Sequence, residues 1–239
     1  MLEAHGVNFA YGSVQVLFGV DLRVDAGEMV ALLGTNGAGK STLLDVLSGL
    51  APPSAGSILL DGEAVTGEDA PSMVRRGVVL VQSGRSVFLD LTVEENLEVG
   101  LHAAGLKRED ARRRIDAMLE RFPALRPLAA RRAGVLSGGE QQHLGIAKGL
   151  ITEPRVLMID ELSLGLAPQA REDLVRVVRE VNAAGTTVVL VEQSLEVGAA
   201  LADRAVFMEK GEVRFDGAVA DLFQRQDLLR SVFLDSADP

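Results

Sequence analysis

Residues 34–41 follow the pattern G-x-x-x-x-G-K-[ST], which is typical of a loop that binds nucleotide phosphates. An apolar run over residues 29–33 leads into the loop, and a helical pattern begins at Ser41. Glycines let successive backbone N–H groups turn inward and form an anion nest at the positive end of a helix. Lys40 would then reach the β- and γ-phosphates, and the Ser41 hydroxyl would bind Mg²⁺. The residues expected around the phosphates are Gly34, Thr35, Asn36, Gly37, Ala38, Gly39, Lys40, Ser41 and Thr42.

This loop predicts a nucleoside triphosphate site, but it does not separate kinases, GTPases and transport ATPases. A second apolar run, residues 156–159, ends in the acids Asp160 and Glu161. The carboxyl ends of strands in an open α/β sheet face the ligand crevice. We therefore expect Asp160 to hold Mg²⁺ and Glu161 to act on the attacking water. With a phosphate loop in the same chain, this interpretation is favoured over two solvated acids.

The remaining apolar runs predict the elements that position these residues. Residues 78–81, 155–159 and 186–191 have strand length, and a helical segment precedes each of the last two. This alternation predicts a parallel sheet. Near the N-terminus we expect short strands, with residues 14–20 interrupted at Gly19. A terminal hairpin is expected over residues 205–215.

Residues 91–134 differ in character from the rest of the chain. Ala111, Ile115, Met118, Leu119 and Phe122 recur at helical spacing, and residues 112–114 are three arginines on or beside the opposite face. The apolar spacing predicts an amphipathic helix, and the arginines are best explained as its solvated face. We therefore expect a helical insertion here.

Composition excludes several classes of protein. The chain has 239 residues, 24 Lys+Arg against 34 Asp+Glu, a net charge of −10 and no cysteine. Disulfide scaffolds, thiolate zinc sites and cysteine nucleophiles are thereby excluded, and an acidic chain is a poor candidate for binding nucleic acid. No apolar run reaches the roughly 18 residues of a membrane-spanning helix, and the first residues lack a secretory signal pattern. These features are typical of a cytoplasmic protein.

Residues 136–142 read Leu-Ser-Gly-Gly-Glu-Gln-Gln, and the Ser-x-x-Glu spacing predicts a capping box at a helix start. Together with the phosphate loop and the acid pair, this segment resembles the signature of the nucleotide-binding subunit of ATP-binding cassette (ABC) transporters. The resemblance covers almost the whole chain. It implies that this segment covers the γ-phosphate of an ATP bound by the opposite subunit, through Leu136, Ser137, Gly138, Gly139 and Glu140.

The resemblance also implies an architecture. The fold class is α/β: a P-loop NTPase (RecA-like) core with a small antiparallel β subdomain and an inserted α-helical subdomain. We expect a single ABC ATPase domain over residues 1–239. Its nucleotide-binding core would comprise residues 1–88 and 136–220, its helical subdomain 89–135, and its C-terminal tail 221–239.

Further roles are implied by position within the family pattern. Tyr11 matches an aromatic residue that stacks on adenine. Gln82 matches the Q-loop glutamine, which senses the γ-phosphate, binds Mg²⁺ and contacts the membrane subunit; the segment after it is one residue longer than usual, so Ser83 competes for the role. Gln193 replaces the switch histidine and can donate a hydrogen bond but cannot carry charge.

The catalytic set is then Glu161, Lys40 and Gln193, and Mg²⁺ would be held by Ser41, Asp160 and Gln82.

Departures from the general pattern resemble one subfamily, the shorter ATPase of branched-chain (hydrophobic) amino acid uptake systems. Leu162 follows the catalytic Glu where most members have Pro, and residues 163–168 read Ser-Leu-Gly-Leu-Ala-Pro. Urea or amide importers of the same subfamily, a single-cassette exporter and a soluble ABC ATPase remain alternatives.

The resemblance implies ATP and Mg²⁺ as cofactors, and a place on the inner face of the cell membrane. The implied partners are a second ABC ATPase subunit (a homo- or heterodimer), transmembrane permeases and, indirectly, an extracytoplasmic substrate-binding protein.

Overall fold

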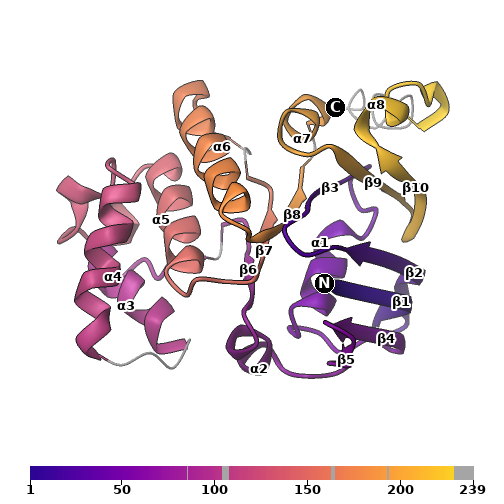
Figure 1. Ribbon diagram of the computed structural model, residues 1–239, viewed down its shortest axis with the longest axis horizontal. Coiled ribbons are helices and arrows are strands. Elements are labelled where there is room, and N and C mark those ends of the chain that lie inside the picture. Colours follow the sequence, from indigo (N-terminus) through magenta and orange to yellow (C-terminus); the bar gives the residue numbers. More distant parts are fainter. Residues whose placement is uncertain (85, 104–107, 163–164, 193, 229–239) are drawn as a thin grey trace.

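The computed structural model describes residues 1–84, 86–103, 108–162, 165–192 and 194–228. A six-stranded sheet runs through the molecule in the order β10-β9-β3-β8-β7-β6 (Figure 1). Strands β9, β3, β8, β7 and β6 are parallel, and β10 pairs antiparallel with β9. The predicted parallel sheet and terminal hairpin are therefore confirmed. The bounds are β3 (Met29–Gly34), β6 (Val78–Val81), β7 (Val156–Asp160), β8 (Thr187–Val191), β9 (Arg204–Glu209) and β10 (Glu212–Ala218).

Both faces of this sheet are buried. Ala31 and Leu33 of β3 belong to one apolar core, while Val30 and Leu32 belong to the other. Successive side chains of a strand point to opposite faces, and a sheet covered on both faces needs apolar residues at every position. This explains why the parallel strands appear in the sequence as uninterrupted apolar runs.

The carboxyl ends of the parallel strands meet at one edge of the sheet. Leu32 of β3 pairs with Val191 of β8, and Val191 pairs with Asp160 of β7. The segments that follow β3, β6, β7 and β8 are therefore neighbours, although they are far apart in the sequence. This edge is where ligands bind in open α/β sheets.

A second, antiparallel sheet has the order β2-β1-β4-β5 and contributes to the core together with α1. Its strands are β1 (Leu2–Tyr11), β2 (Val14–Val24), β4 (Ala55–Leu60) and β5 (Glu63–Ala64). The expected interruption at Gly19 is wrong, because β2 continues through this residue with a φ of +58° and a shift in register against β1. Glycine adopts such a conformation without strain, and irregular pairing of this kind bends a strand without ending it.

Helices lie on both sides of the central sheet, and the antiparallel sheet and the group α3, α4 and α5 occupy opposite ends of the molecule (Figure 1). Ile115, Leu119 and Phe122 of the predicted amphipathic helix are buried, which confirms its apolar face. The helices are α1 (Lys40–Leu47), α2 (Ala70–Arg75), α3 (Val93–Ala103), α4 (Arg108–Arg121), α5 (Gly138–Leu150), α6 (Pro168–Ala183), α7 (Leu195–Leu201) and α8 (Val219–Leu222), with 3-10 turns at Arg126–Leu128 and Ala133–Val135.

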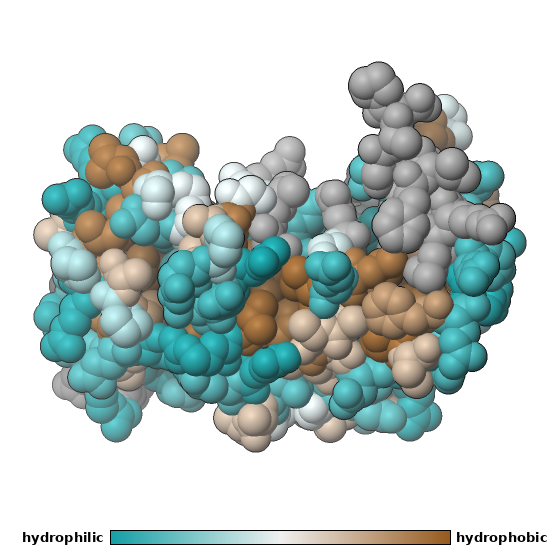
Figure 2. Space-filling model, turned by 90° about the horizontal axis from the view of Figure 1, so that it is seen from above, coloured by the Kyte–Doolittle hydropathy of each residue, from teal (hydrophilic) through white to brown (hydrophobic). Residues whose placement is uncertain are grey.

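The surface is not uniformly polar. Figure 2 views the molecule from the side of α6 and α7, and hydrophobic side chains gather along the middle of this face and are also scattered over one of its ends. Large exposed apolar residues include Phe88, Leu89 and Val135. Within the described part of the chain, no helix combines the length and the apolar character needed to cross a membrane.

Candidate functional site

The loop between β3 and α1 can be built only with glycine at two of its positions. Gly34 has a φ of +144°, and a Cβ there would lie 2.0 Å from the backbone oxygen of Met208 in the neighbouring strand β9. Gly39 has a φ of +94°, and its Cβ would lie 2.9 Å from the side chain of Leu17. Any other residue would be strained and would clash. The two glycines thus let the chain turn tightly from strand into helix.

The start of α1 is open to an anion. Gly39 is the N-cap, no side chain caps the helix, and no acidic residue lies in the first turn. The first backbone N–H groups of a helix have no partner within the helix. Together with the positive end of the helix dipole, they form a site suited to phosphate.

Lys40 is held at the mouth of this loop. It is buried, and its Nζ donates hydrogen bonds to the backbone oxygens of Gly34 (2.9 Å) and Thr35 (2.7 Å). Burial lowers the pKa of Lys40, and the carboxylates of Asp160 and Glu161 oppose this shift. The ammonium is therefore positioned between the phosphate loop and the acid pair.

Asp160, the last residue of β7, has the features of a cation ligand. Burial raises the pKa of its carboxyl; a hydrogen bond with Ser41 opposes this effect, and the carboxylates of Glu161 and Asp45 add to it. Its Oδ1 is buried and has no hydrogen-bond partner among the described residues. A buried, unpartnered carboxylate oxygen beside a hydroxyl fits a hard divalent cation such as Mg²⁺, which takes oxygen ligands.

Glu161 has an uncommon backbone conformation, with a φ of +57°. Two bonds hold it: its N–H donates to Val191 O (3.0 Å) at the end of β8, and its backbone oxygen accepts from Nε2 of Gln142 (3.2 Å) in α5. A non-glycine residue in this region is strained, and such residues cluster at active sites. The glutamate therefore follows the strand end in a fixed position next to the phosphate loop.

A pocket joins the phosphate loop to Glu161. Tyr11, at the end of β1, lies at its edge with 54% of its surface exposed and its ring edge-on to Phe9, 4.8 Å between centroids. An exposed aromatic face beside a phosphate loop can receive a flat base. Sequence patterns do not indicate that Val16 and Val191 line this pocket, because pairing between strands places them here. The pocket is lined by Tyr11, Val16, Asn36, Gly37, Ala38, Gly39, Lys40, Ser41, Thr42, Glu161 and Val191.

Gln82 does not line this pocket, but it is linked to it through Asp45. Its Nε2 donates to Oδ1 of Asp45 (2.9 Å), which is four residues after Ser41 and so lies on the same face of α1. Asp45 in turn raises the pKa of Asp160. The three predicted Mg²⁺ ligands are thus connected: Ser41 bonds to Asp160, and Gln82 is linked to them through Asp45. The role of Asp45 is not evident from the sequence.

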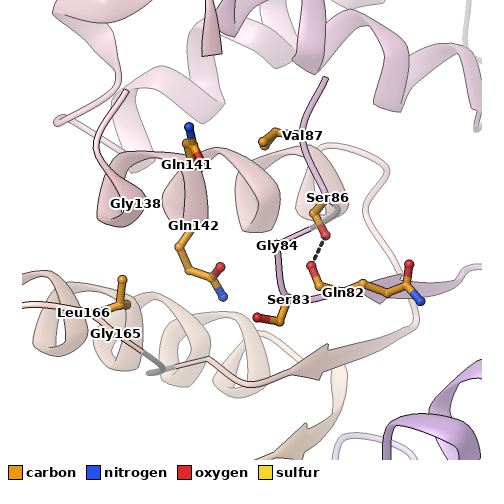
Figure 3. Close-up of a pocket in the computed structure, with 10 residues that line it drawn as sticks. All are labelled: Gln82, Ser83, Gly84, Ser86, Val87, Gly138, Gln141, Gln142, Gly165 and Leu166. Atoms are coloured by element: carbon orange, nitrogen blue, oxygen red, sulfur yellow. Dashed lines mark hydrogen bonds between the residues drawn. The ribbon is translucent and has the colours of Figure 1, made fainter. Parts of the chain in front are cut away.

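A second pocket lies between the segment after β6 and the start of α5 (Figure 3). In it, the side chain of Gln142 extends toward Ser83, whereas the side chain of Gln82 points away from both. The backbone oxygen of Gln82 accepts a hydrogen bond from Ser86 Oγ at 2.6 Å. The side chain of Ser83 thus faces this pocket, while that of Gln82 reaches Asp45.

Residues 136–140 begin α5. Ser137 caps the helix by accepting from the backbone N–H of Glu140, and the Glu140 carboxylate accepts from the N–H of Ser137 at 2.7 Å. The predicted capping box is confirmed. None of Leu136, Ser137, Gly138, Gly139 and Glu140 lines the phosphate-loop pocket, whereas Gly138 lines the second pocket. Gln193, the third predicted catalytic residue, lies outside the described residues.

Comparisons with known proteins agree with this geometry. Residues 17–163 match the ABC transporter family. Two similar proteins are the high-affinity branched-chain amino acid transport ATP-binding proteins BraG and BraF of Pseudomonas aeruginosa. BraG is 41% identical, and the match covers 89% of this chain and 91% of BraG. BraF is 31% identical, and the match covers 97% of this chain and 96% of BraF. A solved dimer of an ATP-binding cassette, in a post-hydrolysis state with ADP and phosphate, is 25% identical with a TM-score of 0.81, covering 92% of this chain and 99% of that one.

The chain therefore belongs to the ABC transporter family, and its fold is that of the ATP-binding cassette. It binds ATP, and its family couples ATP hydrolysis to transport. The expected fold class, an α/β P-loop core with an antiparallel sheet and helical additions, is confirmed.

Proposed function

We propose that this chain is the ATPase subunit of a membrane importer for branched-chain amino acids. The similarity to BraG carries the substrate class, and the pocket that joins the phosphate loop to Glu161 supports the reaction. Because the same fold serves many transporters, the assignment of the substrate rests on the similarity alone.

Each residue of the site has a separate role in ATP binding and hydrolysis. The loop N–H groups and Lys40 bind the phosphates, Tyr11 stacks on the base, and Ser41, Asp160 and Gln82 hold Mg²⁺. The ion would neutralise charge that develops on the transferred phosphoryl group. Glu161 orients the attacking water and accepts its proton, and Gln193 adds a hydrogen bond at the γ-phosphate.

A second ATPase subunit completes each site. Support comes from the position of residues 136–140, which lie outside the phosphate-loop pocket of their own chain, and from the dimeric state of the solved cassette. In this arrangement the start of α5 of one subunit covers the ATP held by the other. The existence of both BraG and BraF makes a heterodimer of two related ATPases as reasonable as a homodimer.

The cassette would act at the inner face of the cell membrane. Permease subunits would dock on the surface near residues 82–96, and a substrate-binding protein on the outer side would deliver the amino acid to them.

Uptake measurements test this function. In the native host with the gene deleted, we expect loss of radiolabelled leucine uptake and unchanged uptake of urea. Expression of the unmodified chain should restore leucine uptake, whereas Lys40→Ala and Glu161→Gln should not. Loss of urea or amide uptake instead would support the alternative importer, and normal uptake of all three substrates would exclude an importer for them.

A further inference from the structure

The turn between β9 and β10 contacts the phosphate loop. It consists of Lys210 and Gly211, and the Gly211 N–H donates to the backbone oxygen of Ala38 in the loop (3.0 Å). The strand before the turn, β9, is also next to the loop, because Met208 pairs with Gly34. The β9–β10 hairpin therefore contacts the loop both at its first residue and close to the start of α1.

The same turn also contacts β2, beside which the hairpin lies (Figure 1). The backbone oxygen of Gly211 accepts from the Phe18 N–H (3.0 Å). Gly211 is buried, and a Cβ here would overlap the backbone oxygen of Val16 and lie 2.7 Å from the Phe18 ring. Glycine is the residue that permits so close an approach of two backbones. A larger residue would push the turn and β2 apart.

These contacts join two sides of the nucleotide pocket, which we call the base wall and the phosphate wall. The base wall consists of Tyr11 and Val16, and the phosphate wall consists of residues 36–42. Tyr11 pairs with Val14 of β2, so that the base wall is continuous with this strand. Because Gly211 bonds to β2 on one side and to the phosphate loop on the other, its position defines the separation of the two walls.

We propose that Gly211 is a positioning residue for the nucleotide, which sets the separation of the base wall and the phosphate wall so that one molecule contacts both. The inference rests on the proposed function, in which Tyr11 stacks on the base. Two linked contacts strengthen each other only where the geometry lets both form at once. A change in the separation should therefore remove the contribution of the base while phosphate alone still binds.

Another hairpin turn of the chain provides a matched control. Asp61 and Gly62 connect β4 to β5 with φ values of +52° and +82°, and Lys210 and Gly211 have φ values of +50° and +82°. A Cβ at Gly62 would have no atom of the described residues within 4 Å. Gly62→Ala therefore introduces the same backbone strain as Gly211→Ala without a clash against β2.

Calorimetric titration with ADP and with pyrophosphate separates the two walls, and neither ligand has a γ-phosphate to be hydrolysed. Pyrophosphate probes the phosphate wall alone, and the affinity for ADP divided by that for pyrophosphate measures the contribution of the nucleoside. We expect Gly211→Ala to lower this ratio about tenfold, within the usual contribution of a base stacked on an aromatic side chain, with little change in pyrophosphate affinity. Tyr11→Ala should lower the ratio similarly, and Gly62→Ala should leave it unchanged.

Amide hydrogen exchange of the unmodified chain provides a second test, which holds even if Gly211→Ala does not fold. With saturating ADP the amides of Phe18 and Gly211 should exchange more slowly than with saturating pyrophosphate, because only ADP holds the two walls together. The Gly62 amide should not differ between the two ligands. Equal exchange of Phe18 and Gly211 with both ligands would overturn the inference.

The outcomes distinguish this inference from the proposed function. If folded Gly211→Ala has the same ratio as Gly62→Ala, or loses affinity for both ligands equally, Gly211 does not set the separation of the walls. If Tyr11→Ala leaves the ratio unchanged, the base does not stack on Tyr11, and that assignment and the inference are both refuted. The importer itself is tested by leucine uptake, which depends on neither ratio.

Discussion

Asp160 shows how a residue can serve ligand binding at the expense of stability. Its carboxylate is buried, faces two other carboxylates and has an unpartnered oxygen, so its pKa is raised. When the pKa of a carboxyl is higher in the folded chain than in the unfolded one, the folded protein loses stability as pH rises. The loss begins near the ordinary pKa of 3.8 and is complete above the raised pKa. At neutral pH the charged form therefore destabilises the fold until a cation binds.

We expect Asp160→Asn to raise the melting temperature at pH 7 in the absence of Mg²⁺, by about 2–4 °C for each kcal/mol relieved. The amide retains the shape and removes the buried charge. Scanning calorimetry of both proteins checks this, and the gain should vanish near pH 3, where the native carboxyl is also neutral. Addition of Mg²⁺ with ADP should stabilise the unmodified chain more than the variant. A variant that melts lower at pH 7 would show that the carboxylate is compensated.

Asp45 and Gln82 should act as a unit. A carboxylate only accepts hydrogen bonds, so its contact with Nε2 of Gln82 (2.9 Å) leaves the amide oxygen as the atom able to face a cation. Partners that orient a metal ligand are worth about 10–100-fold in metal affinity. Asp45→Ala should therefore weaken Mn²⁺ binding in the presence of ADP, measured by electron paramagnetic resonance, by about tenfold.

A double-mutant comparison isolates the coupling. Once Gln82 is replaced by Ala, Asp45→Ala should change Mn²⁺ affinity little, because the residue that it orients is gone. Asp45→Asn keeps an acceptor and serves as the matched control. Fully additive effects of Asp45→Ala and Gln82→Ala would mean that the two residues act independently.

At the scale of the elements, α5 connects separate parts of the molecule. Its first turn carries the capping box, Gln142 holds the backbone of Glu161, and Lys148 contacts the ring of Phe88. A shift of this helix would therefore move the capping box, the backbone of Glu161 and Lys148 together.

The capping box predicts a dependence on pH. Hydrogen bonds from Ser137 hold the pKa of Glu140 below its ordinary value of 4.5. The stability that Glu140 contributes is thus complete above pH 4.5 and is lost as pH falls through the lowered pKa. Glu140→Gln should lower the stability at pH 7 by about 0.3–1 kcal/mol, the usual effect of an acid at a helix start.

Urea unfolding at pH 7 and at pH 3 measures this difference, which should be smaller at the lower pH. Glu172→Gln is the matched control, because Glu172 is exposed on α6 and forms no ion pair within the described residues. An equal loss at both pH values, or the same loss in the control, would contradict the assigned role of the carboxylate.

The elements also show what the sequence could and could not reveal. The parallel strands were found because burial on both faces demands continuous apolar runs, and the phosphate loop because its glycines are sterically required. The first strand, Leu2–Tyr11, was not located, since its inner and outer residues alternate irregularly around Gly6, whose φ is +56°. Asp45 and Gln142 were missed because their roles depend on contacts 37 and 19 residues away along the chain.

At the scale of the whole molecule, the phosphate loop lines one pocket, whereas Gly138 of the segment 136–140 lines another. The position of residues 136–140 outside the phosphate-loop pocket supports the proposed pairing of two chains. The antiparallel sheet places Tyr11 at the phosphate-loop pocket, while α3, α4 and α5 lie at the opposite end of the molecule.

The most direct test of this account is the rate of ATP hydrolysis by the purified chain and its Glu161→Gln variant, with the affinity for a fluorescent ATP analogue measured in parallel. We expect both proteins to bind the analogue equally and the variant to hydrolyse ATP at least about 100-fold more slowly, the usual contribution of a general base. Gln193→Ala should slow hydrolysis less than Glu161→Gln does. A Glu161→Gln variant that hydrolyses ATP at the rate of the unmodified chain would contradict the assignment of Glu161 and with it the proposed mechanism.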